Sequence, residues 1–334
     1  MDSDNQQLTC SLIIPAYNAE KTITVCLDSA LSQSIPKDSY EIIVVDDGSS
    51  DNTASVVSKY DSVKLIKQRN QGPATARNHG AKEAKGNILI FTDSDCELDV
   101  DFIKNLLYEF DENPEIAGVQ GRYKTKQKEF IAQFCQVEIE TRYHKMEQNR
   151  YIDFIGTYAA AYRASIFAKY GGFDTSFPTA SGEDTEFSYR LSGDGYKLVF
   201  SNTAFVYHLH PSKLKKYLRI KFYRGFWRVR LYKKHIHKMV KDSYTPQTLK
   251  IEILISPILP LFFILSYWNV YLLIPAILIV LFFFFSSIPF LRLYHRDKYS
   301  RGYFLAFMLY ARAISIFCGL CFGTLNELLS GNKN

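Results

Sequence analysis

Short apolar runs alternate with segments of helical periodicity along the first hundred residues of the chain. After the last of these runs, Phe102, Leu106 and Phe110 recur at the spacing of one helix face. Alternation of strands and helices predicts an α/β fold with a mostly parallel, Rossmann-like sheet and crossover helices. The predicted strands are rich in Ile, Leu and Val and lie at residues 12–14, 41–45, 63–67 and 88–92.

The last third of the chain contains three long apolar segments, at residues 251–267, 270–291 and 303–325. The second and third reach the roughly 20 residues that a helix needs to cross a hydrocarbon core. The first is shorter, and Pro257 and Pro260 interrupt it. Buried helices of a soluble core are the alternative, but residues 278–285 have no polar face to turn towards water. We therefore expect transmembrane helices over residues 251–327, the first of which can instead be re-entrant or interfacial.

Charge is distributed unevenly, although 40 Lys and Arg against 34 Asp and Glu leave a net charge of only +6. Residues 1–210 carry −9, residues 211–250 carry +12 and the remainder carries +3. In the basic segment the cations alternate with aromatic residues, which favours an amphipathic helix on anionic lipid headgroups over nucleic-acid binding. We expect a folded domain at 1–210, a basic juxtamembrane segment at 211–250 and a transmembrane region at 251–327.

The flanks of the apolar segments predict the orientation in the membrane. The amino terminus, residues 1–4, is acidic and has no apolar signal core. The segment before the first apolar run is basic, and so is the loop that contains Arg292, Arg296, Lys298 and Arg301. Because basic loops stay in the cytoplasm, we expect an integral membrane protein with a cytoplasmic folded domain. An odd number of spans would then place Asn334 on the opposite side.

Acidic residues follow the predicted strands where an open α/β sheet binds its ligands, beyond the carboxyl ends of the strands. Asp93 and Asp95 come directly after the fourth strand, and Asp46 and Asp47 after the second. Two carboxylates one residue apart suit a divalent cation that can also hold a diphosphate, with an acidic surface turn as the alternative. A carboxylate in this segment can accept hydrogen bonds from a base or a ribose; the alternative is an Asx turn that caps the next helix, which is favoured for Asp51. Glycine-rich dinucleotide and P-loop motifs are absent from the sequence.

The order of these motifs resembles glycosyltransferase family 2. The similarity covers roughly residues 9–210 and rests on SLIIPAYN at 11–18, VVDDGS at 44–49, GPATARN at 72–78, DSD at 93–95, GGFD at 171–174 and GED at 182–184. The resemblance implies a GT-A fold, a UDP- or GDP-sugar donor, Mg²⁺ or Mn²⁺ as cofactor, and inversion at the anomeric carbon.

The resemblance also implies a nucleotide pocket and a metal site. Asp93 and Asp95 are expected at the metal and the diphosphate, with Asp95 as the direct ligand. A guanidinium near a diphosphate has a clear use, although Arg77 can instead be a charge on a helix surface. The residues implied for the nucleotide pocket are Pro15, Tyr17, Asp46, Asp47 and Arg77.

Glu183 and Asp184 match the family's acidic pair, which makes Asp184 the expected catalytic base. If the acceptor is an ionised phosphate, Asp184 would orient it rather than deprotonate it. Glu183 is expected either to contact the donor or simply to be favoured at a helix start by the helix dipole. His208 is expected to add a metal contact, with a structural role as the alternative.

Residues 223–227, YRGFW, resemble only in part the QxxRW element of processive polysaccharide synthases, because Tyr223 and Phe226 replace its glutamine and arginine. Arg224 is expected near the donor diphosphate or against lipid. The sequence thus favours transfer of a single sugar to a membrane-embedded polyprenyl phosphate or lipid-linked glycan. A processive synthase, a nucleotidyltransferase and a catalytically silent nucleotide-sugar-binding scaffold are the alternatives.

Overall fold

A computed structural model of the chain describes residues 8–177, 182–240, 242–294 and 302–331. The chain forms two compact units. The first, which we call the α/β unit, comprises the residues up to Lys126 and Glu147–Leu209; the second, the helical unit, comprises Gln127–Met146 and the residues from His210 onward. The sequence-based division treats residues 1–210 as one block, whereas the structure groups residues 127–146 with the C-terminal helices.

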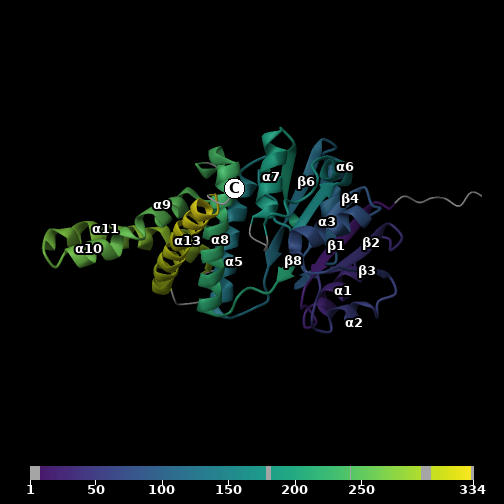
Figure 1. The fold of residues 1–334 in the computed structure, drawn as a ribbon, viewed down its shortest axis with the longest axis horizontal. Coiled ribbons are helices and arrows are strands. Elements are labelled where there is room, and N and C mark those ends of the chain that lie inside the picture. Colours follow the sequence, from purple (N-terminus) through teal and green to yellow (C-terminus); the bar gives the residue numbers. More distant parts are fainter. Residues whose placement is uncertain (1–7, 178–181, 241, 295–301, 332–334) are drawn as a thin grey trace, which may run out of the picture. The chain divides into compact units, whose positions relative to one another are not determined.

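A mixed eight-stranded sheet is the core of the α/β unit, with the strand order β3-β2-β1-β4-β7-β6-β8-β5 (Figure 1). β1 to β4 pair in parallel, so their carboxyl ends lie at one edge of the sheet. β7 and β5 are antiparallel to their neighbours. The strands are β1 Cys10–Ala16, β2 Tyr40–Asp46, β3 Val63–Lys67, β4 Ile88–Thr92, β5 Cys96–Leu98, β6 Ile116–Lys124, β7 Ala159–Arg163 and β8 Lys197–His208.

The four strands predicted from the apolar runs are therefore confirmed as β1 to β4. The side chains of β1, β2 and β4 are mostly buried because helices cover the sheet, whereas the edge strand β3 buries only Val63. α4 buries the predicted stripe of Phe102, Leu106 and Phe110. The helices of this unit are α1 Ile23–Leu31, α2 Thr53–Val57, α3 Pro73–Glu83, α4 Phe102–Glu112, α6 Ala164–Lys169 and α7 Glu183–Gly193.

The helical unit combines α5 with the C-terminal helices around one apolar cluster. Phe134 of α5, Tyr217 of α8, Ile253 of α9 and Met308 of α13 are among its buried members. This shared core is the physical reason why residues 127–146 belong here. The elements are α5 Phe130–Glu147, α8 Leu214–Lys234, η1 Ile236–Met239, α9 Gln247–Ile255, α10 Ile258–Leu265, η2 Val270–Leu272, α11 Leu273–Ser286, α12 Ile288–Tyr294 and α13 Gly302–Gly331.

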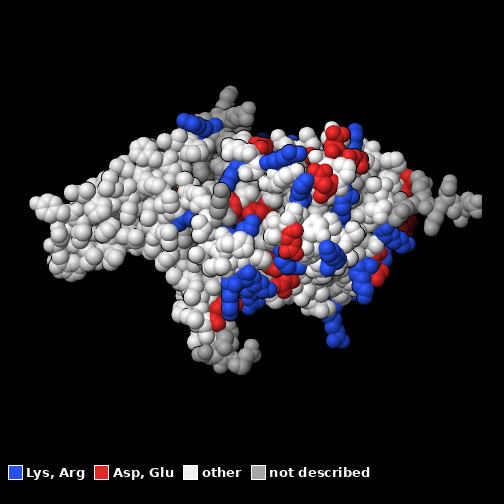
Figure 2. Space-filling model, turned by 90° about the horizontal axis from the view of Figure 1, so that it is seen from above, with Lys and Arg blue, Asp and Glu red and all other residues white. Residues whose placement is uncertain are grey.

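Three described helical stretches are long and apolar enough to cross a membrane: Gln247–Leu265, Val270–Arg292 and Phe304–Leu329. Pro257 lies at the break between α9 and α10, as the interrupted pattern predicted. Figure 2 shows the end of the helical unit formed by α10 and α11 without charged residues, and residues 253–291 contain none.

Several sequence-based expectations concern residues that lie outside the described ranges. These are the acidic amino terminus at residues 1–4, the basic loop positions Arg296, Lys298 and Arg301, and the location of Asn334.

Candidate active site

Arg77 is buried and joins the two acidic motifs of the α/β unit. Its Nη2 donates to Asp93 Oδ1 and its Nη1 donates to Glu183 Oε1, both at 2.8 Å. Only 2% of the Glu183 side chain is exposed, whereas 29% of the Asp93 side chain remains open to solvent. Arg77 is therefore not the helix-surface charge that the sequence left open, and Glu183 does more than begin a helix.

Close packing of α3 on the sheet brings Arg77 to this position. α3 begins at Pro73, and a Cβ atom at Gly80 would lie only 2.5 Å from Ile13 Cγ2 of β1. Because glycine has no side chain, α3 can lie directly against β1. Arg77 precedes Gly80 by about one helical turn and reaches Asp93, which follows the neighbouring strand β4.

Asp184 lies in the first turn of α7 and is only partly exposed. Its Oδ1 accepts a hydrogen bond from the backbone N–H of Thr185 at 2.7 Å. Burial, followed by the negative charge of Glu183, raises the pKa of Asp184 to about 6, and the charge of Arg77 opposes this rise. A carboxylate whose pKa lies near neutrality is suited to accept a proton from a substrate hydroxyl.

Asp93, Asp95 and His208 form a group of potential metal ligands. The ligand atoms of Asp93, Asp95 and the adjacent Cys96 lie within 4.8 Å of one another. His208 Nε2 lies 3.4 Å from Asp95 Oδ2, because β5 and β8 pair with Cys96 opposite His208. Burial raises the pKa of Cys96 well above its usual value, so this thiol stays protonated. Two carboxylates and an imidazole fit Mn²⁺ or Mg²⁺, and the imidazole suits Mn²⁺ better.

Two tyrosines support the ring of His208. Tyr123 of β6 stacks on His208 with ring centroids 4.4 Å apart, and Tyr158 stacks on the other side of Tyr123 at 3.6 Å. Both tyrosines are buried. This stack restricts the imidazole to an orientation in which Nε2 faces Asp95, which is how supporting residues orient metal ligands.

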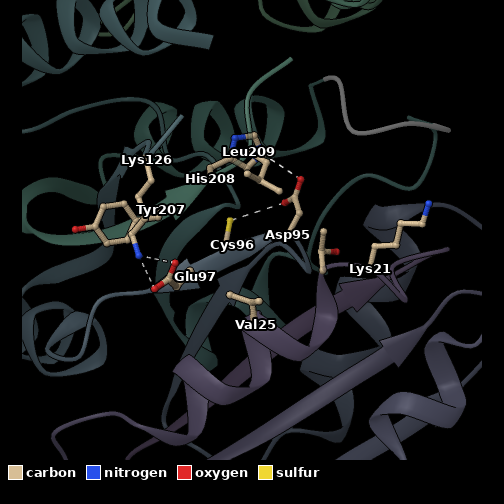
Figure 3. Close-up of a pocket in the computed structure, with 10 residues that line it drawn as sticks. Lys21, Val25, Asp95, Cys96, Glu97, Lys126, Tyr207, His208 and Leu209 are labelled. Carbon is tan, nitrogen blue, oxygen red and sulfur yellow. Dashed lines mark hydrogen bonds and ion pairs between the residues drawn. The ribbon is translucent and has the colours of Figure 1, made fainter. Parts of the chain in front are cut away.

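A pocket of about 190 Å³ opens beside Asp95 and His208 (Figure 3). Its wall includes Tyr207 and Leu209 of the same chain segment as His208. Lys126 Nζ lies 4.3 Å from the centroid of the Tyr207 ring and pairs with both carboxylate oxygens of Glu97 at 2.7 Å. The remaining lining residues are Lys21, Thr22, Val25 and Cys96.

Asp47 holds a loop next to the site. Its Oδ1 accepts hydrogen bonds from Gln68 Nε2 at 2.8 Å and from the Gln71 N–H at 2.9 Å, and its Oδ2 accepts one from the Gly72 N–H at 2.9 Å. Gly72 has φ = 90°, a left-handed conformation that favours glycine. Asp47 thus orders residues 68–72, and because a carboxylate can accept about four hydrogen bonds, its expected contact with a base stays a prediction.

The Oδ1 of Asp46 accepts a hydrogen bond from the Ser49 N–H, three residues on, at 3.1 Å, whereas Asp51 forms an Asx turn with the Thr53 N–H at 3.0 Å. The loops after β1 and β2 are linked, since the Asn18 N–H donates to Ser49 Oγ at 2.9 Å. Pro15 lies in β1 and is half-buried, whereas Tyr17 is 54% exposed. An exposed ring beside an ordered loop pair is available for stacking on a base.

Arg224 lies on α8 in the helical unit and is exposed. Its expected role near the donor diphosphate stays a prediction.

Residues 11–171 match the model of a family described as glycosyl transferase family 2. The chain carries a glycosyltransferase family 2 domain. Among the curated relatives of this domain is the dolichyl N-acetyl-α-D-glucosaminyl phosphate 3-β-D-2,3-diacetamido-2,3-dideoxy-β-D-glucuronosyltransferase of Methanococcus voltae, 28% identical over 63% of this chain and 69% of the relative. The poly(ribitol-phosphate) β-N-acetylglucosaminyltransferase TarS of Staphylococcus aureus is 36% identical over 34% of this chain, and the chain spans only 22% of its length.

Solved glycosyltransferases share the fold of the family 2 domain. Mannosyltransferase PcManGT from Pyrobaculum calidifontis, solved with GDP-Man and Mn²⁺, has a TM-score of 0.62 at 19% identity and covers 95% of this chain and 88% of its own. S. aureus TarS has a TM-score of 0.51 at 23% identity over 66% of this chain and 39% of its own. The expected GT-A fold is thereby confirmed.

Sequence reasoning missed several residues that complete the site. The loop residues Gln68 and Gln71, which bind Asp47, carry no signal that separates them from ordinary surface polar residues. Tyr123 and Tyr158 are distant in sequence from His208, and only the pairing of β6 with β8 brings Tyr123 next to it. Tyr207 was detectable, because it adjoins His208 in a strand-like run.

Proposed function

We propose that this chain transfers a single sugar, with inversion, from a UDP- or GDP-sugar to a lipid-linked acceptor at the cytoplasmic face of a membrane. The observation that carries this proposal is the link between the two acidic motifs: Arg77 joins Glu183, next to the candidate base Asp184, to Asp93 of the candidate metal site. The family 2 domain and the apolar helices of the same chain support it.

Asp184 acts as the general base in this proposal. It accepts the proton of an acceptor hydroxyl while the acceptor oxygen bonds to the anomeric carbon, opposite the bond to the donor phosphate that breaks. Its raised pKa makes it a stronger base than an ordinary aspartate and still leaves it mostly ionised at neutral pH. With an ionised phosphate acceptor, no proton need be removed, and Asp184 orients the acceptor instead.

Asp93, Asp95 and His208 would hold Mn²⁺ or Mg²⁺, which when bound neutralises the charge of the departing nucleoside diphosphate. Arg77 has a positioning role here. It donates hydrogen bonds of 2.8 Å to both Asp93 and Glu183, and so it sets the distance between the candidate metal ligand Asp93 and the candidate base Asp184, which follows Glu183. Tyr17, with Pro15 and the loop that Asp47 orders, would form the nucleotide side.

The lipid acceptor is proposed from the apolar helices and from the name of the M. voltae relative, which specifies a dolichyl-phosphate-linked acceptor. The names of other relatives specify a poly(ribitol-phosphate) acceptor or a polysaccharide synthase. The experiment must therefore distinguish lipid-soluble from polymeric products.

Membranes containing the chain should be incubated with a panel of labelled UDP- and GDP-sugars and with polyprenyl phosphate, polyprenyl-linked glycan or poly(ribitol phosphate). The proposal expects label in the organic extract, one sugar per acceptor, nucleoside diphosphate release and loss of transfer with EDTA or in Asp184→Asn. Label confined to water-soluble or long-chain products would overturn the acceptor assignment. Release of pyrophosphate would indicate a nucleotidyltransferase. An Asp184→Asn variant as active as the parent would show that Asp184 is not the general base.

A further inference from the structure

α13 is long and apolar enough to cross a membrane, yet within the helical unit it lies along α8 (Figure 1) and contacts α5 through side chains. α8 begins at Leu214, shortly after β8 ends at His208, and α5 lies between β6 and β7 along the chain. Neither connection contains an apolar stretch that could cross a bilayer. Both helices must therefore stay on the side of the membrane that holds the α/β unit.

α8 and α13 run parallel and in register. Ser315 Oγ donates to the Leu218 carbonyl at 2.7 Å, and Arg230 Nε pairs with Glu327 Oε1 at 3.1 Å; both pairs are 97 positions apart. Contacts at the two ends with the same offset mean that residues 218–230 accompany residues 315–327 along their whole length.

Glycines bring the two backbones together. A side chain at Gly319 or Gly323 would collide with the backbone of α8, and one at Gly225 would collide with the Ile316 carbonyl. Spacing of small residues by four positions is a known way for helices to approach closely. Gly225 and its neighbour Phe226, whose backbone meets Gly323, belong to the YRGFW segment, so this partial QxxRW element is used here for helix packing.

α8 cannot enter hydrocarbon. It has nine cations and no acidic residue, and ion pairs to Glu138 and Glu327 compensate part of its charge. Cations at the depth of the bilayer core are costly and rare. A helix in backbone contact with α8 occupies the same medium, so residues 315–327 of α13 also lie outside the core. The cations of α8 are Lys215, Lys216, Arg219, Lys221, Arg224, Arg228, Arg230, Lys233 and Lys234.

The rest of α13 is too short to cross. Residues 304–314 span roughly 16 Å as a helix, about half of the roughly 30 Å core. This part contacts both α5 and α9. Phe304 meets Phe130 of α5 with ring centroids 5.3 Å apart, and Arg312 lies 3.7 Å from Glu138 Oε1 of α5 and 2.5 Å from Glu252 Oε2 of α9. α13 is thus accompanied at both ends by helices that are confined to one side.

We infer that α13 lies with α8 and α5 at the membrane surface, on the side of the α/β unit. Among the described helices, only the hairpin formed by the stretches Gln247–Leu265 and Val270–Arg292 then enters the bilayer. The exposed cations of α8 then face anionic lipid headgroups, and the end of α13 lies on the same side as the α/β unit. Three spans would instead place the end of α13 on the side opposite to the α/β unit. The inference does not depend on which sugar or acceptor the chain uses.

Cysteine labelling in sealed vesicles of each orientation tests the inference. Cys318 and Cys321 would be replaced by alanine, whereas Cys10, Cys26, Cys96 and Cys135 can stay because they are buried. Single cysteines would then be introduced at exposed positions: Lys59→Cys marks the side of the α/β unit, and Asn326→Cys and Leu329→Cys report the end of α13.

A membrane-impermeant maleimide is expected to label Asn326→Cys and Leu329→Cys in the same vesicles as Lys59→Cys, and not in vesicles of the opposite orientation. Labelling of the two α13 positions only in the opposite vesicles would show that α13 crosses the membrane. Labelling only after detergent is added would place them in hydrocarbon. Either result would overturn the inference.

Discussion

Arg77 and Glu183 act on Asp184 with opposite signs, which provides a direct test of the site. Burial and the negative charge of Glu183 raise the pKa of Asp184 to about 6, whereas the positive charge of Arg77 lowers it. A general base must be deprotonated, so transfer to a hydroxyl acceptor should fall as the pH drops through about 6.

Replacing Arg77 or Glu183 should move the midpoint of this loss of activity at acidic pH, which we call the acid limb of the pH profile, in a defined direction. Arg77→Met removes the cation, so the midpoint should move to higher pH, by on the order of one pH unit. Glu183→Gln removes the anion, so the midpoint should move to lower pH by a similar amount. Both substitutions preserve the approximate size of the side chain.

Arg77→Met should also destabilise the domain, because it leaves the buried Glu183 and the partly exposed Asp93 without their shared cation. Breaking a buried ion pair from one side costs about 3–5 kcal/mol. For a domain of this size that corresponds to a loss of roughly 6–20 °C in Tm. Arg77→Lys keeps the charge but cannot bridge two carboxylates in the same way, and an intermediate loss is expected.

The assay is kcat/KM against pH with labelled donor in detergent, together with thermal melts of the same preparations. Lys64→Met is the matched control, because Lys64 pairs with Glu83 on the exposed surface. Lys64→Met should change neither the midpoint of the acid limb nor the melting temperature. If Arg77→Met fails to fold, Arg77→Lys and Glu183→Gln still carry the test. If the acid limbs of the Arg77 and Glu183 variants move in the same direction, or keep the parent's midpoint, Asp184 is not the general base.

Three further predictions concern the metal, the α8–α13 contact and the buried charges. His208→Ala should raise the Mn²⁺ concentration for half-maximal activity at least about tenfold, measured by titration of the EDTA-treated protein. Gly319→Leu should force α13 away from the Phe222 carbonyl and cost about 1–3 kcal/mol in thermal unfolding. Glu138 is buried, and although burial alone would raise its pKa, Lys221 and other cations hold it well below its usual range. Glu138→Gln should therefore lower stability by about 3–5 kcal/mol.

Matched controls separate these effects from general damage. His210→Ala removes a histidine that bonds to Gln136 in the helical unit, so it should leave the Mn²⁺ requirement unchanged. Gly193→Ala adds a Cβ where no atom lies within 4 Å and should not destabilise the fold. An unchanged Mn²⁺ requirement in His208→Ala, or a parent-like melt in Gly319→Leu or Glu138→Gln, would contradict the corresponding prediction.

Local patterns determined much of the fold in advance. The apolar runs that became β1, β2 and β4 are nearly continuous because strands covered on both faces need apolar residues at almost every position. The edge strand β3 contains the exposed Lys64 and Lys67. The long apolar helices, and the break at Pro257, follow from the same reasoning. The acidic motifs were detectable because Asp93, Asp95 and Asp184 lie in short motifs whose spacing is local.

Contacts between distant segments could not be predicted in this way. The ion pair of Arg77 with Glu183 joins residues 106 positions apart, and the approach of His208 to Asp95 depends on the antiparallel pairing of β5 with β8. The hydrogen bonds by which Asp47 orders residues 68–72 also join positions that are 21 to 25 residues apart.

The membrane region shows the same division between sequence and structure. Composition alone determined that α13 is long and apolar enough to span a bilayer, since hydropathy depends only on the residues of the segment itself. Whether such a helix does span depends on the medium of its neighbours. Only the tertiary structure placed the basic helix α8 against Gly319 and Gly323, because backbone contact between two helices is a property of neither sequence alone.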